Sequence, residues 1–203
     1  MRKRPDSRSD EHFRALLAQE AARLFCDHGI EDYRIAKSKA AENLGLRNYG
    51  ALPNNREIEQ ALAERNRIFG GSQQQHLLTN LRNIAFSVMQ KLQLFSPYLV
   101  GPVLSGNVTE YSTIKLHLFS DMAESVSIHL QNQGIRHHTM LRKHRLRQDA
   151  LEEFPSYRFF ADDCGIEATV FSERLKAHAP LSPVDRKPMQ RAKLRDVELL
   201  VVA

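Results

Sequence analysis

The apolar pattern of this chain changes its period at Pro97. Before this residue, apolar side chains recur every three or four positions, which is the spacing of one face of an α-helix. After it, apolar and polar residues alternate over short runs such as 98–104 and 113–119, which is the spacing of a β-strand. Apolar residues spaced for a helix do not form one face of a strand, and those spaced for a strand do not form one face of a helix. We therefore expect an α+β protein with a helical region over residues 1–95 and a mixed domain over 96–203.

Turn residues divide the first half into separate predicted helices. Gly29 ends the first apolar stripe, the stretch RNYGALPNN follows the second, and glycines 70 and 71 end the third. We expect Asn55 to cap the third helix, because a side-chain oxygen at that position can accept a bond from a free backbone N–H. The helices predicted between these breaks cover residues 10–28, 32–45, 55–69 and 73–94.

The stretch EAARLFCDHGIEDYRIAKSKAAENLGL resembles the opening of a TetR-type helix-turn-helix. In such a domain a recognition helix with basic or polar side chains follows directly. Here a turn-rich segment follows, and the next predicted helix carries Glu57, Glu59 and Glu64, which would repel DNA phosphates. We therefore favour a helical packing module over a DNA-reading one.

Composition limits the class of protein further. With 42% hydrophobic and 26% charged residues, the chain has the makeup of a globular protein, and no run of 18 apolar residues predicts a membrane span. Cys26 and Cys164 match no zinc spacing, and the basic opening MRKR lacks the apolar core of a secretory signal, so we expect reduced thiols and a cytoplasmic protein. The net charge of +5 leaves a polyanionic partner open.

The second half predicts strands and helices in alternation. The runs YRFFADD and IEATVF are joined by residues 162–165, which favour a tight hairpin turn. Gly134 is the expected stop of the helix that Asp121 begins. The expected elements are strands over 98–104, 113–119, 135–147, 157–163 and 166–171, a helix over 121–133, and a final helix over 191–200.

The order of elements around Gly101 resembles that of a known family. In the minimal nucleotidyltransferase domain of the polymerase β-like enzymes, a helix leads to a strand that ends in Gly-Gly or Gly-Ser, and the following strand carries Asp-x-Asp. Here LVGP (Gly101, Pro102) stands in the first position, STIKLHLF stands in the second, and IEATVF supplies Glu167 as a candidate third carboxylate. The resemblance implies a mixed sheet with flanking helices, on which the helical region packs.

The acidic residues of the family motif are replaced in this chain. Nucleotidyl transfer uses two divalent cations, and Mg²⁺ requires hard anionic oxygen ligands. Thr113 offers a neutral hydroxyl, and the Lys115 ammonium would repel a dication. We therefore predict a diverged family member without two-metal catalysis and with no cofactor. Mg²⁺ would need other carboxylates, of which Asp121, Asp162 and Asp163 are the first candidates.

The resemblance implies nucleotide or phosphate binding at the 101–115 loop and strand. Lys115 can hold a phosphate in place of the metal, or it can be a solvated strand lysine. Glu167 can be catalytic, or it can be a surface or salt-bridged residue with Lys115 as its partner. The small polar residues of the loop can line a phosphate site or form a turn. The candidate nucleotide- or phosphate-binding residues are Gly101, Ser105, Ser112, Thr113 and Lys115.

A basic strand offers a second candidate site. In MLRKHRLR the alternation of a strand places Lys143, Arg145 and Arg147 on one face, where they can contact nucleic-acid phosphates. A solvated edge strand, protected from aggregation by its charges, is the alternative interpretation. His138 and His144 share a face but lie about 20 Å apart along a strand, too far for one metal ion. We predict no metal site. The alternative function is therefore a non-enzymatic module that binds nucleic acid or protein on the same scaffold.

Overall fold

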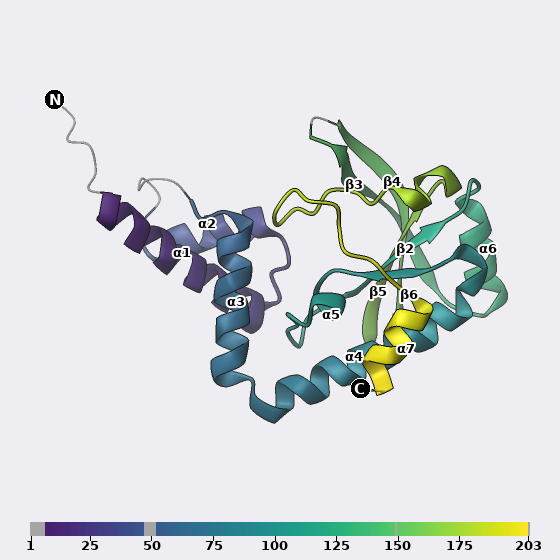
Figure 1. Ribbon diagram of the computed structural model, residues 1–203, viewed down its shortest axis with the longest axis horizontal. Coiled ribbons are helices and arrows are strands. Elements are labelled where there is room, and N and C mark those ends of the chain that lie inside the picture. The colour runs from purple at the N-terminus through teal and green to yellow at the C-terminus, as the bar shows by residue number, and fades with distance from the viewer. Residues whose placement is uncertain (1–6, 47–51, 149, 203) are drawn as a thin grey trace. The chain divides into compact units, whose positions relative to one another are not determined.

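The protein is described here by a computed structural model that covers residues 7–46, 52–148 and 150–202. Its helices and strands are labelled in Figure 1. The structure is α+β, with helices in the first half of the chain and a mixed sheet in the second, which confirms the predicted fold class. No helix within these ranges is long and apolar enough to cross a membrane.

The chain divides into two compact units. The helical unit contains the residues up to Gln74 together with Thr109–Tyr111. The sheet unit contains Gln75–Val108 and the chain from Ser112 onward. The division therefore falls near Gln74, whereas the sequence predicted a boundary at residue 95, because most of the last helix before the sheet packs with the sheet.

The helical unit is built from α1 (Ser7–His28), α2 (Tyr33–Asn43) and α3 (Asn55–Phe69). Its core is rich in alanine, and small side chains allow helix axes to approach closely. Larger apolar residues complete the core at the positions that the helical periodicity indicates. The buried residues are Leu17, Ala18, Ala21, Ala22, Leu24, Phe25, Ala36, Ala40, Ala41, Ile58 and Leu62.

Side-chain caps fix where two of these helices begin. The Asp32 carboxylate accepts hydrogen bonds from the backbone N–H groups of Arg34 and Ile35, at 2.8 and 3.0 Å. Helix α3 begins with a capping box, in which the Asn54 side chain accepts from the Glu57 N–H at 2.9 Å and the Glu57 carboxylate accepts from the Asn54 N–H. The cap is thus Asn54 and not the predicted Asn55, because only Asn54 lies three residues before the glutamate.

The sheet unit holds strands in the order β3-β4-β5-β2-β1-β6, counted over the described residues. Strand β2 pairs antiparallel with β1 and parallel with β5, and the β3–β4–β5 pairs are antiparallel. The strands are β1 (Tyr98–Val100), β2 (Ile114–Phe119), β3 (His137–Arg147), β4 (Ala150–Ala161), β5 (Cys164–Phe171) and β6 (Ala192–Lys193). The helices are α4 (Gly71–Lys91), α5 (Pro102–Ser105), α6 (Glu124–Asn132) and α7 (Leu194–Val202), with short 3-10 turns at Gln93–Phe95 and Glu173–Ala177.

One face of this sheet is apolar and carries the main core. Alternate residues of β2 and β5, such as Leu116 and Ala168, are fully buried there against α4 and α6. This is the helix-covered face that strand alternation requires. Its central residues are Leu99, Ile114, Leu116, Leu118, Tyr157, Phe159, Ile166, Ala168 and Val170 from the strands, with Ile84, Val88, Met89, Val126 and Leu130 from the helices.

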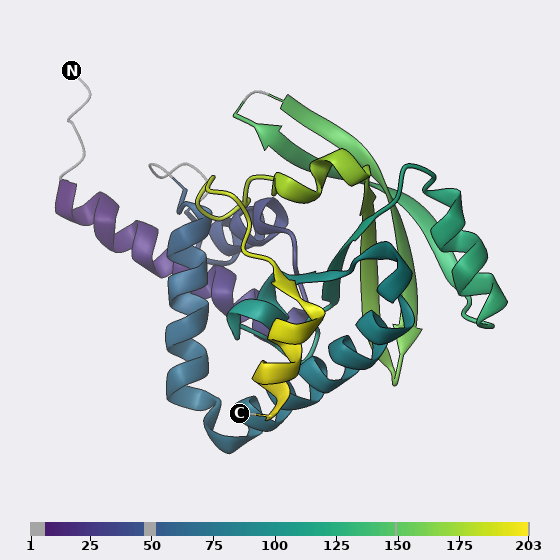
Figure 2. The same ribbon diagram turned by 45° about the vertical axis from the view of Figure 1, so that its right-hand side comes forward.

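The opposite face, here called the polar face, carries Lys115, His117, Glu167 and Thr169 on β2 and β5. Part of it is covered by a smaller core of Phe119, Phe154 and Phe171, against which Tyr98, Leu146 and Leu175 pack. The chain from Ser172 to Arg191, here called the strap, follows β5 and passes across the sheet (Figure 2). A sheet with one helix-covered face and one partly open face leaves room for a site.

The strands expected over 98–104, 113–119 and 166–171 correspond to β1, β2 and β5, which are adjacent in one sheet. The helix after Asp121 also covers one face, as expected. The expected strand over 98–104 is wrong in its second half. Gly101 has φ +73° and ψ −151°, so the chain turns there, and Pro102 begins the short helix α5.

The β3–β4 hairpin is longer than predicted. The sequence indicated a strand from residue 157, but β4 begins at Ala150. The stretch ALEEFP carries no strand alternation, and its glutamates and proline are residue types depleted in strands. Pro155 pairs with Leu141 of β3 and precedes the residues of β4 that pair with β5, so its missing N–H costs no bond to that strand. The tight turn after β4 is confirmed: Asp162 and Asp163 have φ of 46° and 63°, as a two-residue primed turn needs.

The backbone conformation at position 101 predicts that glycine is required there. Its φ and ψ lie in a region that is essentially restricted to glycine, so Gly101→Ala should lower the free energy of unfolding by about 1–3 kcal/mol. Gly165→Ala is the matched control in the same sheet. A Cβ at Gly165 would lie 3.7 Å from Thr113, an ordinary contact, and should change stability by less than about 0.5 kcal/mol. Urea unfolding of both variants measures the difference, and equal losses would contradict this account of Gly101.

Candidate functional site

The register of β2 against β5 brings predicted site residues together. Lys115 is the partner of Glu167 in the parallel pair, and it is also the partner of Val100, which precedes Gly101. Lys115 Cδ lies 3.5 Å from the point that a Cβ on Gly101 would occupy. The residues at 101, 115 and 167 therefore meet on one part of the sheet, although they are distant in sequence.

Thr113 and the two serines occupy different surroundings. Thr113 is 8% exposed and lies just before β2, within 4 Å of the Cβ position of Gly165. Ser112 precedes it and is half-buried. The Ser105 hydroxyl donates a bond to the Pro102 carbonyl at 3.3 Å, so it serves its own helix α5. The structure thus places Thr113 beside β5, and it gives the Ser105 hydroxyl a partner within α5.

Glu167 is paired with a residue that the sequence did not indicate. Its carboxylate is nearly buried, with the residue 8% exposed, and it accepts a hydrogen bond from the Arg142 guanidinium. A buried carboxylate needs such a partner, because leaving its charge uncompensated is strongly destabilising. Glu167 therefore forms an ion pair with Arg142, whereas the sequence suggested Lys115 as its partner. Arg142 belongs to β3, at the far end of the sheet order, which is why no local pattern pointed to it.

Basic side chains surround Glu167 on the polar face. Strand pairing places Arg158 of β4 beside Glu167, with His138 of β3 beside Arg158, and both of these side chains are exposed. We call Lys115, Arg142, Arg158 and Glu167 the cationic cluster. Its three cations and single carboxylate sum to a net charge of +2. This part of the face is therefore electrostatically suited to an anion.

Two histidines and an arginine fill the covered part of the same face. Arg191 at the end of the strap donates from Nε to His117 Nδ1 at 3.2 Å and from Nη1 to the Lys176 carbonyl at 3.2 Å. The Arg191 guanidinium lies 5.2 Å from the centre of the Phe119 ring, within cation–π range. The His117 and His144 rings are perpendicular, with centres 5.4 Å apart. The imidazoles are thus held between the strap and the hairpin.

Burial keeps both imidazoles neutral. It lowers the pKa of His117 well below the ordinary value, and the Arg191 guanidinium and the protonated form of His144 act in the same direction. Burial also lowers the pKa of His144 to about 4, with a partial opposing effect of Glu167 and further lowering by Arg142, Arg191 and Lys115. Burial likewise lowers the pKa of Arg191. The charges that act on His144 show that the cationic cluster and the histidines are electrostatic neighbours.

The strap is fastened at several points. The Asp121 carboxylate accepts from the Glu173 N–H at 3.1 Å, and Lys176 Nζ donates to the Ser96 hydroxyl at 2.7 Å. The Leu181 N–H donates to the Arg145 carbonyl at 2.6 Å, which joins the strap to β3. With His117 at 2% and Thr169 at 3% exposure, the strapped part of the polar face is closed. The part with the exposed Arg158 stays accessible.

The basic strand gives its side chains local partners. Lys143 forms an ion pair with Glu153 across the hairpin at 3.3 Å, and Arg145 donates to the Gln148 carbonyl. The register shifts between Arg145 and Arg147, so the regular alternation on which the prediction rested ends there. Strand β3 is at the edge of the sheet, where charged residues prevent strand addition. Nucleic-acid contact by Lys143, Arg145 and Arg147 stays a prediction.

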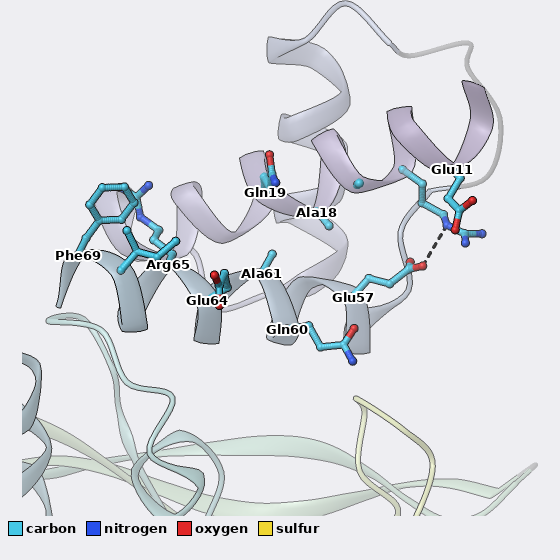
Figure 3. A pocket seen from close by; sticks show the side chains of 12 residues that line it. Glu11, Ala18, Gln19, Glu57, Gln60, Ala61, Glu64, Arg65 and Phe69 are labelled. Atoms are coloured by element: carbon cyan, nitrogen blue, oxygen red, sulfur yellow. Dashed lines mark ion pairs between the residues drawn. The ribbon is translucent and has the colours of Figure 1, made fainter. Parts of the chain in front are cut away.

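A separate cavity of about 470 Å³ lies in the helical unit between α1 and α3 (Figure 3). Its floor includes the small residues Ala18 and Ala61. Three carboxylates and two guanidiniums line it, and one pair of them, Arg14 with Glu57, forms an ion pair at 3.0 Å. Because the lining charges sum to −1, the cavity does not favour an anion, in contrast to the polar face.

No group of three or more His, Cys, Asp or Glu side chains in the described ranges is arranged to hold a metal ion. Comparison of the chain with protein-family models, with curated proteins and with solved structures gives no match. The features that bear on function are therefore the chemistry of the polar face and the arrangement of β1, β2 and β5.

The neutral histidines predict a loss of stability in mild acid. Since the pKa of His144 is about 4 in the folded protein and about 6.5 in the unfolded chain, the unfolded state binds more protons between these values. Stability should be full above pH 6.5 and should fall by about 2 kcal/mol from pH 7.5 to pH 5 for this group alone. His144→Gln should flatten the dependence measured by urea unfolding. His138→Gln, an exposed histidine on the same strand, is the control, and an equal flattening by it would contradict the assignment.

Proposed function

We propose that this chain is a diverged relative of the minimal nucleotidyltransferases that binds the phosphates of a nucleotide, without a metal ion, at the cationic cluster. The observation that carries the proposal is the pairing of Lys115 with Glu167 on adjacent parallel strands, next to a glycine that ends β1. The resemblance implies a strand ending in glycine, a second strand after it and a third strand adjacent in the sheet, and β1, β2 and β5 have this order and adjacency. A cytoplasmic location agrees with a nucleotide ligand.

Metal-dependent transfer is not the activity we propose. At the positions of the two aspartates stand the Thr113 hydroxyl and the Lys115 ammonium. Mg²⁺ takes oxygen ligands, with carboxylates supplying the negative charge that two-metal transfer needs. Glu167 is the carboxylate beside these positions, and it already holds Arg142. The Lys115 ammonium would repel a dication bound beside it, and this repulsion would weaken binding of the ion by several kcal/mol at an intermediate dielectric.

The same residues suit a phosphate. Lysine presents its charge as a compact ammonium, and arginine presents parallel N–H donors that match phosphate oxygens. Arg142 can exchange part of its bonding to Glu167 for a phosphate oxygen, because Lys115 stays beside the carboxylate when it does so. The net charge of +2 in the cluster replaces the charge that a metal ion supplies in the family. Binding is proposed here, and turnover is not.

Calorimetry with ATP, CTP and GTP, with and without Mg²⁺, tests this proposal. We expect binding that does not require Mg²⁺ and a fall in affinity of about tenfold or more in Lys115→Ala, because one charge-assisted contact to phosphate is lost. Lys143→Ala is the matched control, since Lys143 is an exposed lysine of the same sheet outside the cluster. Absence of heat under every condition, or affinity that appears only with Mg²⁺, would overturn the proposal.

Restoring the acidic motif tests the strand alignment separately. In the double variant Thr113→Asp with Lys115→Asp, two carboxylates would stand beside Glu167 and should create a site for a divalent cation. Titration with Mn²⁺, followed by calorimetry, should show binding in this variant. The matched control replaces both residues with Asn, which has the same shape and no charge. If the aspartate variant binds Mn²⁺ no better than the asparagine variant, the alignment with the family motif is wrong.

A further inference from the structure

The accessible part of the polar face ends in an uncovered aromatic ring. Phe160 is 67% exposed and lies on β4, two residues after Arg158 and therefore on the same face of the sheet. Its partner on β5 is Gly165, which presents no side chain to the ring. The preceding residue, Phe159, points to the other face and is 2% exposed in the main core. Strand alternation thus holds the backbone of Phe160 in place while its ring faces solvent.

The surroundings of Phe160 distinguish it from an isolated surface apolar residue. Exposed apolar side chains that occur singly need no explanation. An aromatic ring on a sheet beside a basic groove is the arrangement by which proteins stack a nucleobase while cations hold the backbone phosphates. Arg158 lies two residues before Phe160 on the same face of β4. Across the sheet from Arg158 lie Glu167 on β5 and then Lys115 on β2. An aromatic ring and an anion-binding cluster therefore share one open surface.

The spacing of these groups suits a single ligand. Phe160 and Lys115 are separated by two strand spacings across the sheet and by two residues along it, which corresponds to about 12 Å between their Cα atoms. A nucleoside triphosphate in an extended conformation can place its base on Phe160 and its terminal phosphate at Lys115. Arg158 stands beside this path, two residues from Phe160 on β4 and level with Lys115 across β5, where it would contact the inner phosphates.

We propose that Phe160 is the stacking platform for the base of the nucleotide whose phosphates lie at the cationic cluster. This inference rests on the proposed function and adds to it the residue that contacts the base, so that the site favours a ligand with a nucleobase over an inorganic polyphosphate or a sugar phosphate. A phenyl ring offers a stacking surface without hydrogen bonds, so the platform accepts each base. The structure assigns recognition of the base to β4 and recognition of the phosphates to β2 and β3.

The test compares ATP with tripolyphosphate, which carries similar charge but no base. Calorimetry without Mg²⁺ should give tighter binding of ATP to the unaltered protein. Phe160→Ala should weaken ATP binding about tenfold and leave tripolyphosphate binding unchanged. Phe160→Trp should restore ATP binding, because indole is also a stacking surface. Leu151→Ala is the matched control: Leu151 is 53% exposed, lies on the same strand and belongs to the opposite face, so it should change neither affinity.

The outcomes separate this inference from the function on which it rests. If Lys115→Ala weakens both ligands while Phe160→Ala weakens neither, the phosphate site stands and the platform is overturned. If neither ligand binds to the unaltered protein, both proposals fail. Equal weakening of both ligands by Phe160→Ala would also overturn the platform, since a base-free ligand makes no stacking contact. An eight-residue oligothymidylate serves as a further probe: loss of its binding in Phe160→Ala without loss of ATP binding would assign the ring to single-stranded nucleic acid instead.

Discussion

The parallel pairing of β2 with β5 is the constraint on which the rest of the sheet unit depends. Its register is set by the apolar face, where Leu116 and Ala168 are fully buried with their neighbours. A slip by one residue would move these side chains to solvent and Lys115 to the helices, and each buried leucine or isoleucine contributes about 1.5–3 kcal/mol. Several such residues lie on each strand, so their burial contributes more to the choice of register than the charged side chains of the opposite face do. The meeting of Lys115 with Glu167 is therefore a consequence of core packing.

Compensation of charge then shapes the polar face. Glu167 is too buried to be left without a cation, and Arg142 reaches it from the β3–β4 hairpin. On the covered side, Arg191 is held by His117, which can accept its hydrogen bond only while the imidazole is neutral. The low pKa of His117 is thus part of what fastens the end of the strap. The two sides are coupled electrostatically through His144, whose pKa responds to charges from both.

The sequence predicted what local patterns determine. The strand before Gly101, the strand that carries Lys115 and a turn within 162–165 were expected, because alternation, a glycine and turn residues are visible over a few positions. Arg142 and Arg191 were missed, since their roles arise from contacts across 25 and 74 positions of the chain. Phe160 was assigned to a strand, but its exposure follows from Gly165 opposite it, which only the register reveals. The beginning of β4 was missed because Pro155 is acceptable only where β5 has not yet begun to pair.

The charges on the polar face bear on whether it is a functional surface. A face without a ligand would be more stable with neutral or apolar side chains, since burying charge without compensation is unfavourable. This face instead holds a half-buried lysine at position 115, an arginine paired with a buried carboxylate, and two imidazoles kept neutral by their surroundings. Local departures from the most stable choice concentrate at functional sites in proteins. A net positive, partly desolvated surface beside an exposed phenyl ring is such a departure. An anion that carries an aromatic group would both compensate the positive charge and cover the exposed ring.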